Sequence, residues 1–316
     1  MKKTTFARLL QVVVKNDKLN LINKAYVGGN IPVKQDKAIL IFLWYMSKPD
    51  TLNSIAHQFH VVPSTVMRIV NVLLYILLQL KRTYICWPNT VEEYDQITQE
   101  FIPYPGVIGA IDGTHINLKV PMNQHDSYAN RYLSHSINLM AISTARKIFT
   151  YVFIGYPGSA HDSRVFSNSL FSLNIQRHGP QIYFPHERYH LIGDSAFPLR
   201  TWLMTPYRKT NNMPRIQKHH NSCLSSNRVC IEHAFGLLKG RWRRLFFINT
   251  YSISKAIEIV TVACILHNFC YLCCDEWENE NMHVEDDEIE YEEDHRDRDQ
   301  LLLGTIKRNN IAQNLL

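Results

Sequence analysis

The sequence predicts an α/β fold, with a mixed β-sheet flanked by helices, preceded by an all-α region. Two observations support this prediction. Apolar runs rich in Ile, Val, Phe and Tyr, which are typical of strands, begin near residue 106, whereas the preceding residues carry helical patterns. From there the expected order is a series of strands, a helix, one more strand and two helices, which indicates an α/β protein with a mixed sheet.

The first 95 residues are expected to form helices, and residues 51–80 have the spacing of a helix-turn-helix. The turn falls at 60–62, and Pro63 suits the first position of the second helix. Such a unit can contact DNA, but the same spacing occurs in purely structural bundles, so both interpretations stay open. The side chains expected to face DNA are Ser64, Thr65 and Arg68.

A connector with three prolines leads into the β region. The expected strands lie at 106–112, 116–120, 136–144, 147–156 and 189–194. A short helix is expected at 161–171, and two longer helices at 228–245 and 254–272. We therefore divide the chain into a helical region (1–95), an α/β domain (96–274) and an acidic tail (275–316).

Charge is distributed unevenly along the 316 residues. Residues 275–316 contain 14 acidic and 4 basic side chains, a net charge of −10, which leaves +16 on residues 1–274. A strongly basic body predicts DNA as a partner, although a basic surface can also serve solubility alone. The acidic tail is expected to be disordered and to cover the basic body in cis.

No membrane association is expected. The N-terminus lacks a signal-peptide pattern, and the longest apolar stretch, 69–80, is shorter than the ~20 residues that span a bilayer. Seven cysteines, an odd number, indicate a reducing intracellular compartment. Four of them lie with His267 at 264–274. A buried helix is preferred there over a zinc site, because no second C-x-x-C pair completes the ligand set.

Four acidic residues stand apart from the solvated charges of the body. Asp112 and Asp194 each end an apolar strand. Asp162 opens the short helix, and Glu232 lies on the first long helix. If the two strands are neighbours, these carboxylates meet at one rim of the sheet, where they repel each other unless cations neutralise them. Oxygen ligands favour Mg²⁺ or Mn²⁺.

Helical geometry places Glu232 at the margin of a buried face. Ile231 and Phe235 belong to an apolar stripe, and Arg228 and Glu232 belong to a polar stripe about 100° round the helix. The plainer alternative is an i, i+4 ion pair between Glu232 and Arg228, worth a few tenths of a kcal/mol. If Glu232 is considered by itself, the ion pair is the preferred interpretation. Because two strand-ending aspartates accompany it, we prefer Glu232 as a metal ligand.

A carboxylate cluster that holds two divalent ions ~3.5–4 Å apart can perform in-line phosphoryl transfer. One ion activates a water or a 3′-hydroxyl, and the other stabilises the departing oxygen. No cysteine or serine nucleophile is evident, and Trp242 is expected to pack in the core. The basic residues expected to contact DNA phosphates are Arg228, Lys239, Arg241, Arg243 and Arg244.

Six blocks of sequence come in a characteristic order: "YPGVIGAIDGTHI", "YANRYLSHSINLMAI", "GYPGSAHDSRVFSNSLF", "LIGDSAF", "NRVCIEHAFGLLKGRW" and "ILHNFC". Together they resemble the PIF/Harbinger-type transposases and the transposase-derived nucleases of animals. The resemblance covers roughly residues 35–272. Tyr132-Leu133 and Phe197 depart from the family pattern, which often has Lys-Gly and tyrosine at these positions, and neither departure touches an acidic position.

The resemblance implies an RNase H-like DDE catalytic fold and a divalent-metal-dependent nuclease or transposase activity. It implies that Asp112, Asp194 and Glu232 form the catalytic triad and bind two Mg²⁺ or Mn²⁺ ions, with Asp162 as a further metal ligand. It also implies that the protein is located in the nucleus, and an additional cytoplasmic location stays open. A separate Myb-like (SANT/MADF-type) protein is expected to supply DNA binding, and a homo-oligomer stays open.

The alternative function is a domesticated factor that keeps the transposase fold and binds DNA or protein without cutting. The intact acidic positions favour the nuclease. An RNase H-like enzyme that acts on RNA is a weaker interpretation, because the sequence contains nothing that resembles an RNA-stacking motif.

Overall fold

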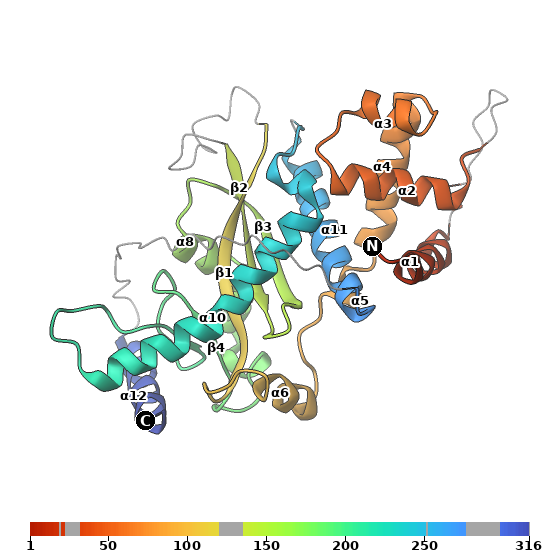
Figure 1. Ribbon diagram of the computed structural model, residues 1–316. Helices are drawn as coiled ribbons and strands as arrows, with labels where there is room; N and C mark the ends of the chain where they lie inside the picture. The colour runs from red at the N-terminus through yellow and green to blue at the C-terminus, as the bar shows by residue number, and fades with distance from the viewer. Residues whose placement is uncertain (19, 23–31, 120–134, 251, 276–297, 316) are drawn as a thin grey trace.

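The computed structural model describes residues 1–316 except 19, 23–31, 120–134, 251, 276–297 and 316. Figure 1 shows a twisted central sheet with helices on both faces and a separate group of helices beside it. The departures from the family pattern at residues 132 and 133 lie outside the described residues.

The sheet has five strands in the order β3-β2-β1-β4-β5. β1 pairs antiparallel with β2, and β2 antiparallel with β3, whereas β1–β4 and β4–β5 are parallel pairs. The strands are β1 (Val107–Asn117), β2 (Ser136–Ser143), β3 (Phe149–Pro157), β4 (His190–Gly193) and β5 (Leu203–Met204). This mixed sheet between helices, preceded by an all-α region, confirms the predicted fold class.

β1 is longer than the sequence predicts, because the two strands expected at 106–112 and 116–120 are one strand. Asp112 therefore lies inside β1, and the prediction that it ends a strand is wrong. Pairing with β2 continues along β1 as far as Asn117, which keeps the backbone extended through the polar residues. β4 does end at Gly193, opposite Ile111, so Asp112 lies where the parallel pairing stops.

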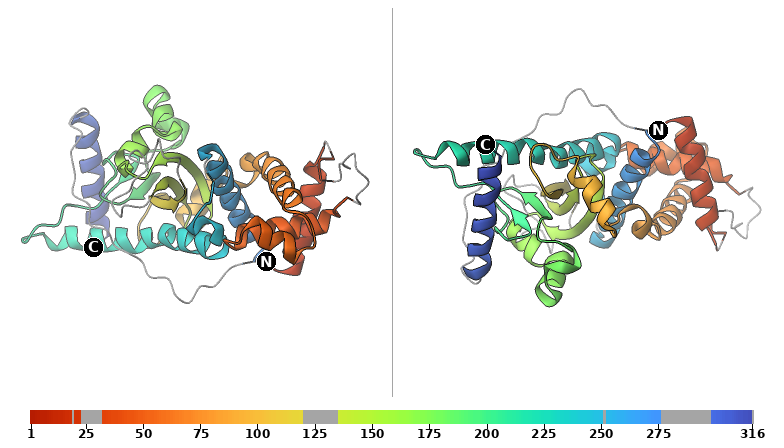
Figure 2. Two further views of the ribbon diagram at one scale, coloured as in Figure 1. Left: turned by 90° about the horizontal axis from the view of Figure 1, so that it is seen from above. Right: turned by 90° about the horizontal axis from the view of Figure 1, so that it is seen from below.

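Helices cover the two faces of the sheet, as the two views of Figure 2 show. On one face lie α10 (Arg215–Arg241), which contacts β1, and α11 (Ile253–Leu272), which contacts β3. On the other face lie α8 (Asp162–Ser167) and α9 (Leu170–His178). The alternation of strand side chains follows these layers: Ala110 of β1 packs toward α10 and Ile111 toward α8.

α10 begins well before the predicted start at residue 228. The polar stretch that precedes 228 is helical because one side of it is buried. Leu224 is buried, and His220 is fully buried with its Nε2 2.7 Å from the hydroxyl of Tyr104. Beyond α10 the chain forms a short 3-10 helix (Arg243–Phe246) after Trp242, which is buried as predicted.

The N-terminal region is helical, as predicted. Its helices are α1 (Lys3–Asn16), α2 (Gln35–Ser47), α3 (Leu52–Gln58), α4 (Pro63–Leu78) and α5 (Lys81–Tyr84). α3 and α4 meet at an angle of 101°, and His60 in the turn between them has a left-handed φ of 50°. The proline-containing connector holds a further helix, α6 (Val91–Thr98), which starts with a capping box formed by Thr90 and Glu93.

One of the described helices, α11, is long and apolar enough to span a membrane. It packs against β3 on one side and α4 on the other, and most of its residues are buried. Cys264 and Cys270 lie in this buried part, and the imidazole Nε2 of His267 is 2.8 Å from the carbonyl of Lys147. The prediction of a buried helix is thereby confirmed for Cys264 and Cys270, whereas the helix ends at Leu272 and Cys274 is exposed.

Part of the acidic tail is folded. α12 (Arg298–Asn314) packs against α10 and β5, so the prediction of disorder is wrong for this stretch. Ile311 and Ala312 are buried. Arg308 lies over the ring of Tyr207 at 4.0 Å, and Lys307 donates to the carbonyl of Thr201 at 2.7 Å. These contacts come from residues about a hundred positions away, which local sequence patterns do not reveal.

Candidate active site

β1 and β4 bring Asp112 and Asp194 to the same place. The strands are parallel, and both aspartates follow directly after the last paired residues. Each carboxylate accepts a local hydrogen bond through Oδ1, Asp112 from the amide of Gly113 and Asp194 from the amide of Ala196, both at 2.8 Å. The parallel register therefore fixes two carboxylates side by side at one edge of the sheet.

Asp162, the first residue of α8, reaches this edge from the opposite face of the sheet. Its carboxylate lies over Gly113, since a Cβ on this glycine would come within 2.5 Å of Asp162 Oδ1. Asn138 on β2 donates to the same oxygen at 2.9 Å. Asn138 is buried, and its own Oδ1 has no hydrogen-bond partner in the described part of the chain. A glycine at position 113 is what permits this close approach.

Glu232 on α10 is connected to Asp112 through Arg228. The guanidinium of Arg228 lies 2.7 Å from Oδ2 of Asp112 and 2.6 Å from Oε1 of Glu232. All three side chains are largely buried, with 15–16% of their surface exposed. The i, i+4 ion pair between Arg228 and Glu232 is therefore present. The same guanidinium also pairs with Asp112 and so connects α10 to β1.

The cluster has too little positive charge for its carboxylates. Burial and the carboxylates of Asp112, Asp162 and Glu232 raise the pKa of Asp194 to about 7, although the guanidinium of Arg228 opposes this shift. Burial also raises the pKa of Asp112, and the charge of Asp162 adds to this effect, although Arg228 opposes it. Among the described residues, Arg228 is the arginine that contacts these acidic groups, at Asp112 and Glu232, and the remaining negative charge attracts further cations.

The donor set fits a hard divalent cation. The four acidic groups offer carboxylate oxygens, and Asn138 has an unpartnered amide oxygen beside Asp162, all of which suit Mg²⁺ or Mn²⁺. Within the part of the chain that the structure describes, no three His, Cys, Asp or Glu side chains are arranged to share one metal ion. The guanidinium of Arg228 instead lies between Asp112 and Glu232.

Two of the basic residues predicted to contact DNA are buried. Arg241 is 8% and Arg244 5% exposed. Arg241 pairs with Asp275 at 3.2 Å, and Arg244 donates to the carbonyls of Tyr45 at 3.0 Å and Asp50 at 2.7 Å. Their guanidinium groups hold helices together, so the prediction that Arg241 and Arg244 contact DNA is wrong.

The other predicted DNA contacts differ in their surroundings. Lys239 on α10 donates to the hydroxyl of Thr114 at 2.7 Å, so it lies beside the carboxylate cluster. Arg243 is exposed at the end of α10, and Arg228 takes part in the bridge described above. Lys239 therefore lies on the same face of the sheet as Asp112, whereas Arg243 is exposed in the 3-10 helix that follows α10.

In the helix-turn-helix unit, Ser64 is exposed and Thr65 is partly buried. Arg68 is partly buried, and its guanidinium donates to the carbonyl of Leu21 at 3.3 Å. This arginine is the only Lys or Arg between residues 51 and 80. The exposed surface of the unit thus offers little positive charge for a phosphate backbone.

Sequence reasoning missed Gly113, Thr114 and Asn138. The signal for the first two is the period of two along "DGTH", which directs Asp112 and Thr114 to one face of the sheet and Gly113 to the other. The signal for Asn138 is a polar residue inside the otherwise apolar strand "SINLMAIS". A buried polar side chain requires a partner, and here that partner is Asp162.

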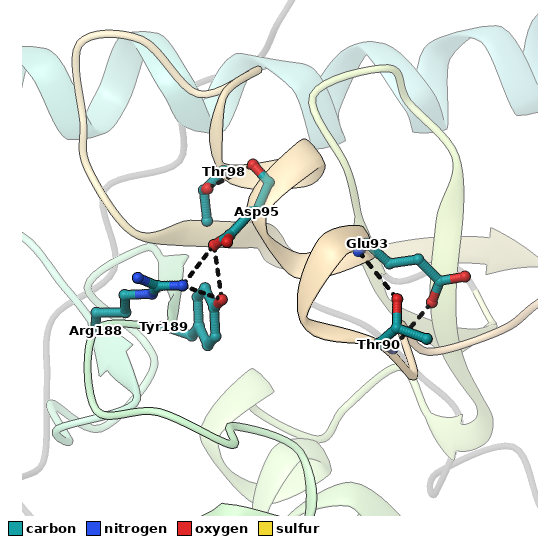
Figure 3. Close-up of polar contacts among 6 residues, drawn as sticks. All are labelled: Thr90, Glu93, Asp95, Thr98, Arg188 and Tyr189. Carbon is teal, nitrogen blue, oxygen red and sulfur yellow. Dashed lines mark hydrogen bonds and ion pairs between the residues drawn. The ribbon is translucent and has the colours of Figure 1, made fainter.

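A cavity of about 350 Å³ lies elsewhere, where β1 and β4 begin, and its lining includes Asp95, Arg188, Tyr189, His190 and Lys307. Figure 3 shows that the carboxylate of Asp95 accepts hydrogen bonds from Arg188 and Tyr189, both at 2.7 Å. The carboxylate cluster is not part of the lining of this cavity, in which Asp95 pairs with Arg188 and Lys307 donates to backbone carbonyls.

Comparison with known proteins identifies the family. A family model described as DDE superfamily endonuclease matches residues 111–268, which include all four carboxylates. "Putative nuclease HARBI1" is 34% identical in Bos taurus and 33% in Homo sapiens, over 169 residues that make up 52% of this chain and 46% of each relative. "Protein ALP1-like" of Arabidopsis thaliana is 25% identical over 281 residues, 85% of this chain and 68% of that protein.

The match thus spans about half the length of the animal relatives. No solved structure matches the chain significantly. The family model covers half of the chain, from β1 to the buried part of α11, and includes every acidic residue of the cluster. The chain belongs to the DDE superfamily endonucleases, of the Harbinger type.

Proposed function

We propose that the protein is a divalent-metal-dependent DNA endonuclease of transposase origin. The observation that carries this proposal is the meeting of Asp112, Asp162, Asp194 and Glu232 at the edge where β4 ends, with the pKa of Asp194 raised to about 7. Strongly shifted acids that gather around one point are typical of functional sites. Membership of an endonuclease family supports the same conclusion.

In this proposal Asp112, Asp194 and Glu232 hold two Mg²⁺ or Mn²⁺ ions, and Asp162 assists them. Bound ions would stabilise charge on the phosphodiester and lower the pKa of the attacking water. The protein's own task is to keep four oxygen donors at one edge. Asn138 performs part of it, because its hydrogen bond holds the carboxylate of Asp162 against the sheet.

DNA is the proposed substrate. Lys239 lies on the face of the sheet that carries Asp112, where a phosphate backbone would pass, and the exposed Arg243 follows in the 3-10 helix after α10. The helix-turn-helix has one basic residue, Arg68, which is engaged with the carbonyl of Leu21. Sequence-specific binding in this proposal comes from a separate Myb-like protein, and the protein acts in the nucleus.

The test is cleavage of supercoiled DNA with and without Mn²⁺. We expect wild type to nick the DNA only with the metal, and Asp194→Asn to lower the rate by about a hundredfold or more while DNA binding, measured by filter retention, survives. Glu258→Gln is the matched control, because it removes a carboxylate that is 38% exposed and that, within the described residues, forms an ion pair with Lys255 on α11. Equal cleavage by wild type and Asp194→Asn would contradict the proposal.

The alternative is a DNA- or protein-binding factor that does not cut. One observation favours it: Arg228 already neutralises part of the cluster from within the protein, at Asp112 and Glu232. Such a factor would bind DNA equally well with and without Mn²⁺. It would show no nicking, and Asp194→Asn would leave its DNA affinity unchanged.

A further inference from the structure

The bridge formed by Arg228 occupies the oxygens that a metal ion would need. Its guanidinium contacts Oδ2 of Asp112 at 2.7 Å and Oε1 of Glu232 at 2.6 Å. The other oxygen of Asp112, Oδ1, accepts the backbone amide of Gly113 at 2.8 Å. Both oxygens of Asp112 therefore already have a hydrogen-bond donor.

Only one of these two donors can leave. The amide of Gly113 belongs to a strand that is paired with β2 on both sides of this position, so it is fixed by the sheet. The guanidinium of Arg228 lies at the end of a flexible side chain, which is 15% exposed on α10. Each oxygen keeps a second lone pair, but a divalent cation bound to Oδ2 would lie within a few ångströms of the guanidinium charge, and this repulsion favours release of Arg228.

We propose that Arg228 is an internal counter-cation, which a divalent metal ion displaces from Asp112 and Glu232 when it binds. This inference rests on the proposed function, since it concerns the same metal site. The displaced side chain remains on the α10 face beside Lys239 and Thr114. A planar guanidinium there is suited to bind a DNA phosphate through two hydrogen bonds.

Two consequences follow. In the absence of DNA the metal binds weakly, because it must break two charge-assisted hydrogen bonds that are largely shielded from solvent. A DNA phosphate that accepts the released guanidinium favours the displaced state, so DNA and metal bind cooperatively. By linkage, each ligand then raises the affinity of the other by the same factor. Arg228 is thus a positioning residue that connects substrate binding to assembly of the site.

The first experiment measures Mn²⁺ affinity by calorimetry without DNA for wild type, Arg228→Gln and Arg228→Lys. We expect Arg228→Gln to bind Mn²⁺ about tenfold tighter than wild type, because the competing charge is gone, and Arg228→Lys to lie between them. A purely structural arginine would give the opposite change, since its loss would distort the site. Arg215→Gln is the charge-matched control, an exposed arginine on α10 about 20 Å along the helix axis.

The second experiment uses the unaltered protein, in case Arg228→Gln does not fold. The side-chain Nε–H signal of Arg228 is followed by NMR during titration with Mg²⁺ and is assigned by its absence in Arg228→Lys. We expect a saturable shift of this signal at the Mg²⁺ concentrations at which calorimetry detects binding. Addition of DNA should lower the concentration that gives half of the shift.

The outcomes separate the inference from the proposed function. If Mn²⁺ binds wild type and Arg228→Gln equally, or binds while the Arg228 signal stays unchanged, Arg228 does not compete and only this inference fails. If none of the variants nor wild type binds Mn²⁺, with or without DNA, the metal-dependent function fails as well. Tighter binding by Arg228→Gln but not by Arg215→Gln supports the proposal.

Discussion

Asp194→Asn should stabilise the metal-free protein, although it removes a residue of the proposed catalytic site. In the folded protein Asp194 has a pKa of about 7, against an ordinary value of 3.8, because it is buried beside other carboxylates. Asparagine keeps the hydrogen bond from the amide of Ala196, since its Oδ1 can accept at the same position. The substitution therefore removes the unfavourable charge and retains the local geometry.

The sign of the effect follows from proton linkage. Below pH 4 the carboxyl is protonated in both the folded and the unfolded protein, so its ionisation has no effect on stability. Between pH 4 and 7 the unfolded chain releases the proton while the folded protein keeps it, so the free energy of unfolding falls as the pH rises. A pKa difference from 3.8 to about 7 corresponds to a loss of about 4 kcal/mol at most, at 1.36 kcal/mol per pKa unit.

The assay is urea unfolding with EDTA at pH 5, 6 and 7.5, for wild type, Asp194→Asn and Glu258→Gln. We expect Asp194→Asn to exceed wild type by an amount that grows with pH and reaches about 2–4 kcal/mol at pH 7.5. Glu258→Gln removes an exposed ion pair worth at most about 1 kcal/mol and should follow the wild-type pH dependence. Equal pH slopes for wild type and Asp194→Asn would refute the claim that the cluster lacks positive charge.

Three further substitutions test the packing around the site and the core. Gly113→Ala should push the carboxylate of Asp162 away from the sheet and lower the free energy of unfolding by about 1–3 kcal/mol, as measured by thermal melts. It should also abolish Mn²⁺-dependent nicking of DNA. A variant that still nicks would contradict this prediction. Arg241→Met should lower the free energy of urea unfolding by about 2–3 kcal/mol, because the buried Asp275 loses its arginine partner and keeps the backbone amide of Lys2 as a donor. An unchanged midpoint would show that the pair is not structural. Asn268→Leu should lower the melting temperature strongly, because the Asn268 side chain forms hydrogen bonds with three backbone groups of β3 and α5. A decrease of less than 2 °C would contradict this role.

Local patterns were sufficient to predict which elements carry the acidic residues. Asp194 follows β4, Asp162 opens α8, and Glu232 lies on α10, all as expected from apolar runs and helical spacing. The same patterns failed for Asp112, because the polar residues that follow it interrupt the apolar run while the pairing with β2 continues. Strand length there is set by a partner strand about 20 to 30 residues further along the chain.

The basic residues show a different limit of sequence reasoning. Arg241 and Arg244 lie next to Lys239 and Arg243 in the sequence, and nothing local distinguishes a DNA contact from a buried ion pair. Their partners are 34 and up to 199 positions away. Only the packing of the 3-10 helix against α2, and the pairing of Arg241 with Asp275, show that these two guanidinium groups are internal.

α11 packs against both the sheet and α4, and one continuous hydrophobic cluster runs from α1 through these helices to β1. The helical region and the α/β domain therefore should not melt separately, and heating should give a single calorimetric transition. If residues 96–274 were expressed alone, they would present the uncovered side of α11 to water, an apolar surface that invites aggregation. The N-terminal helices are thus expected to keep the apolar side of α11 out of water and so to protect the α/β domain from aggregation.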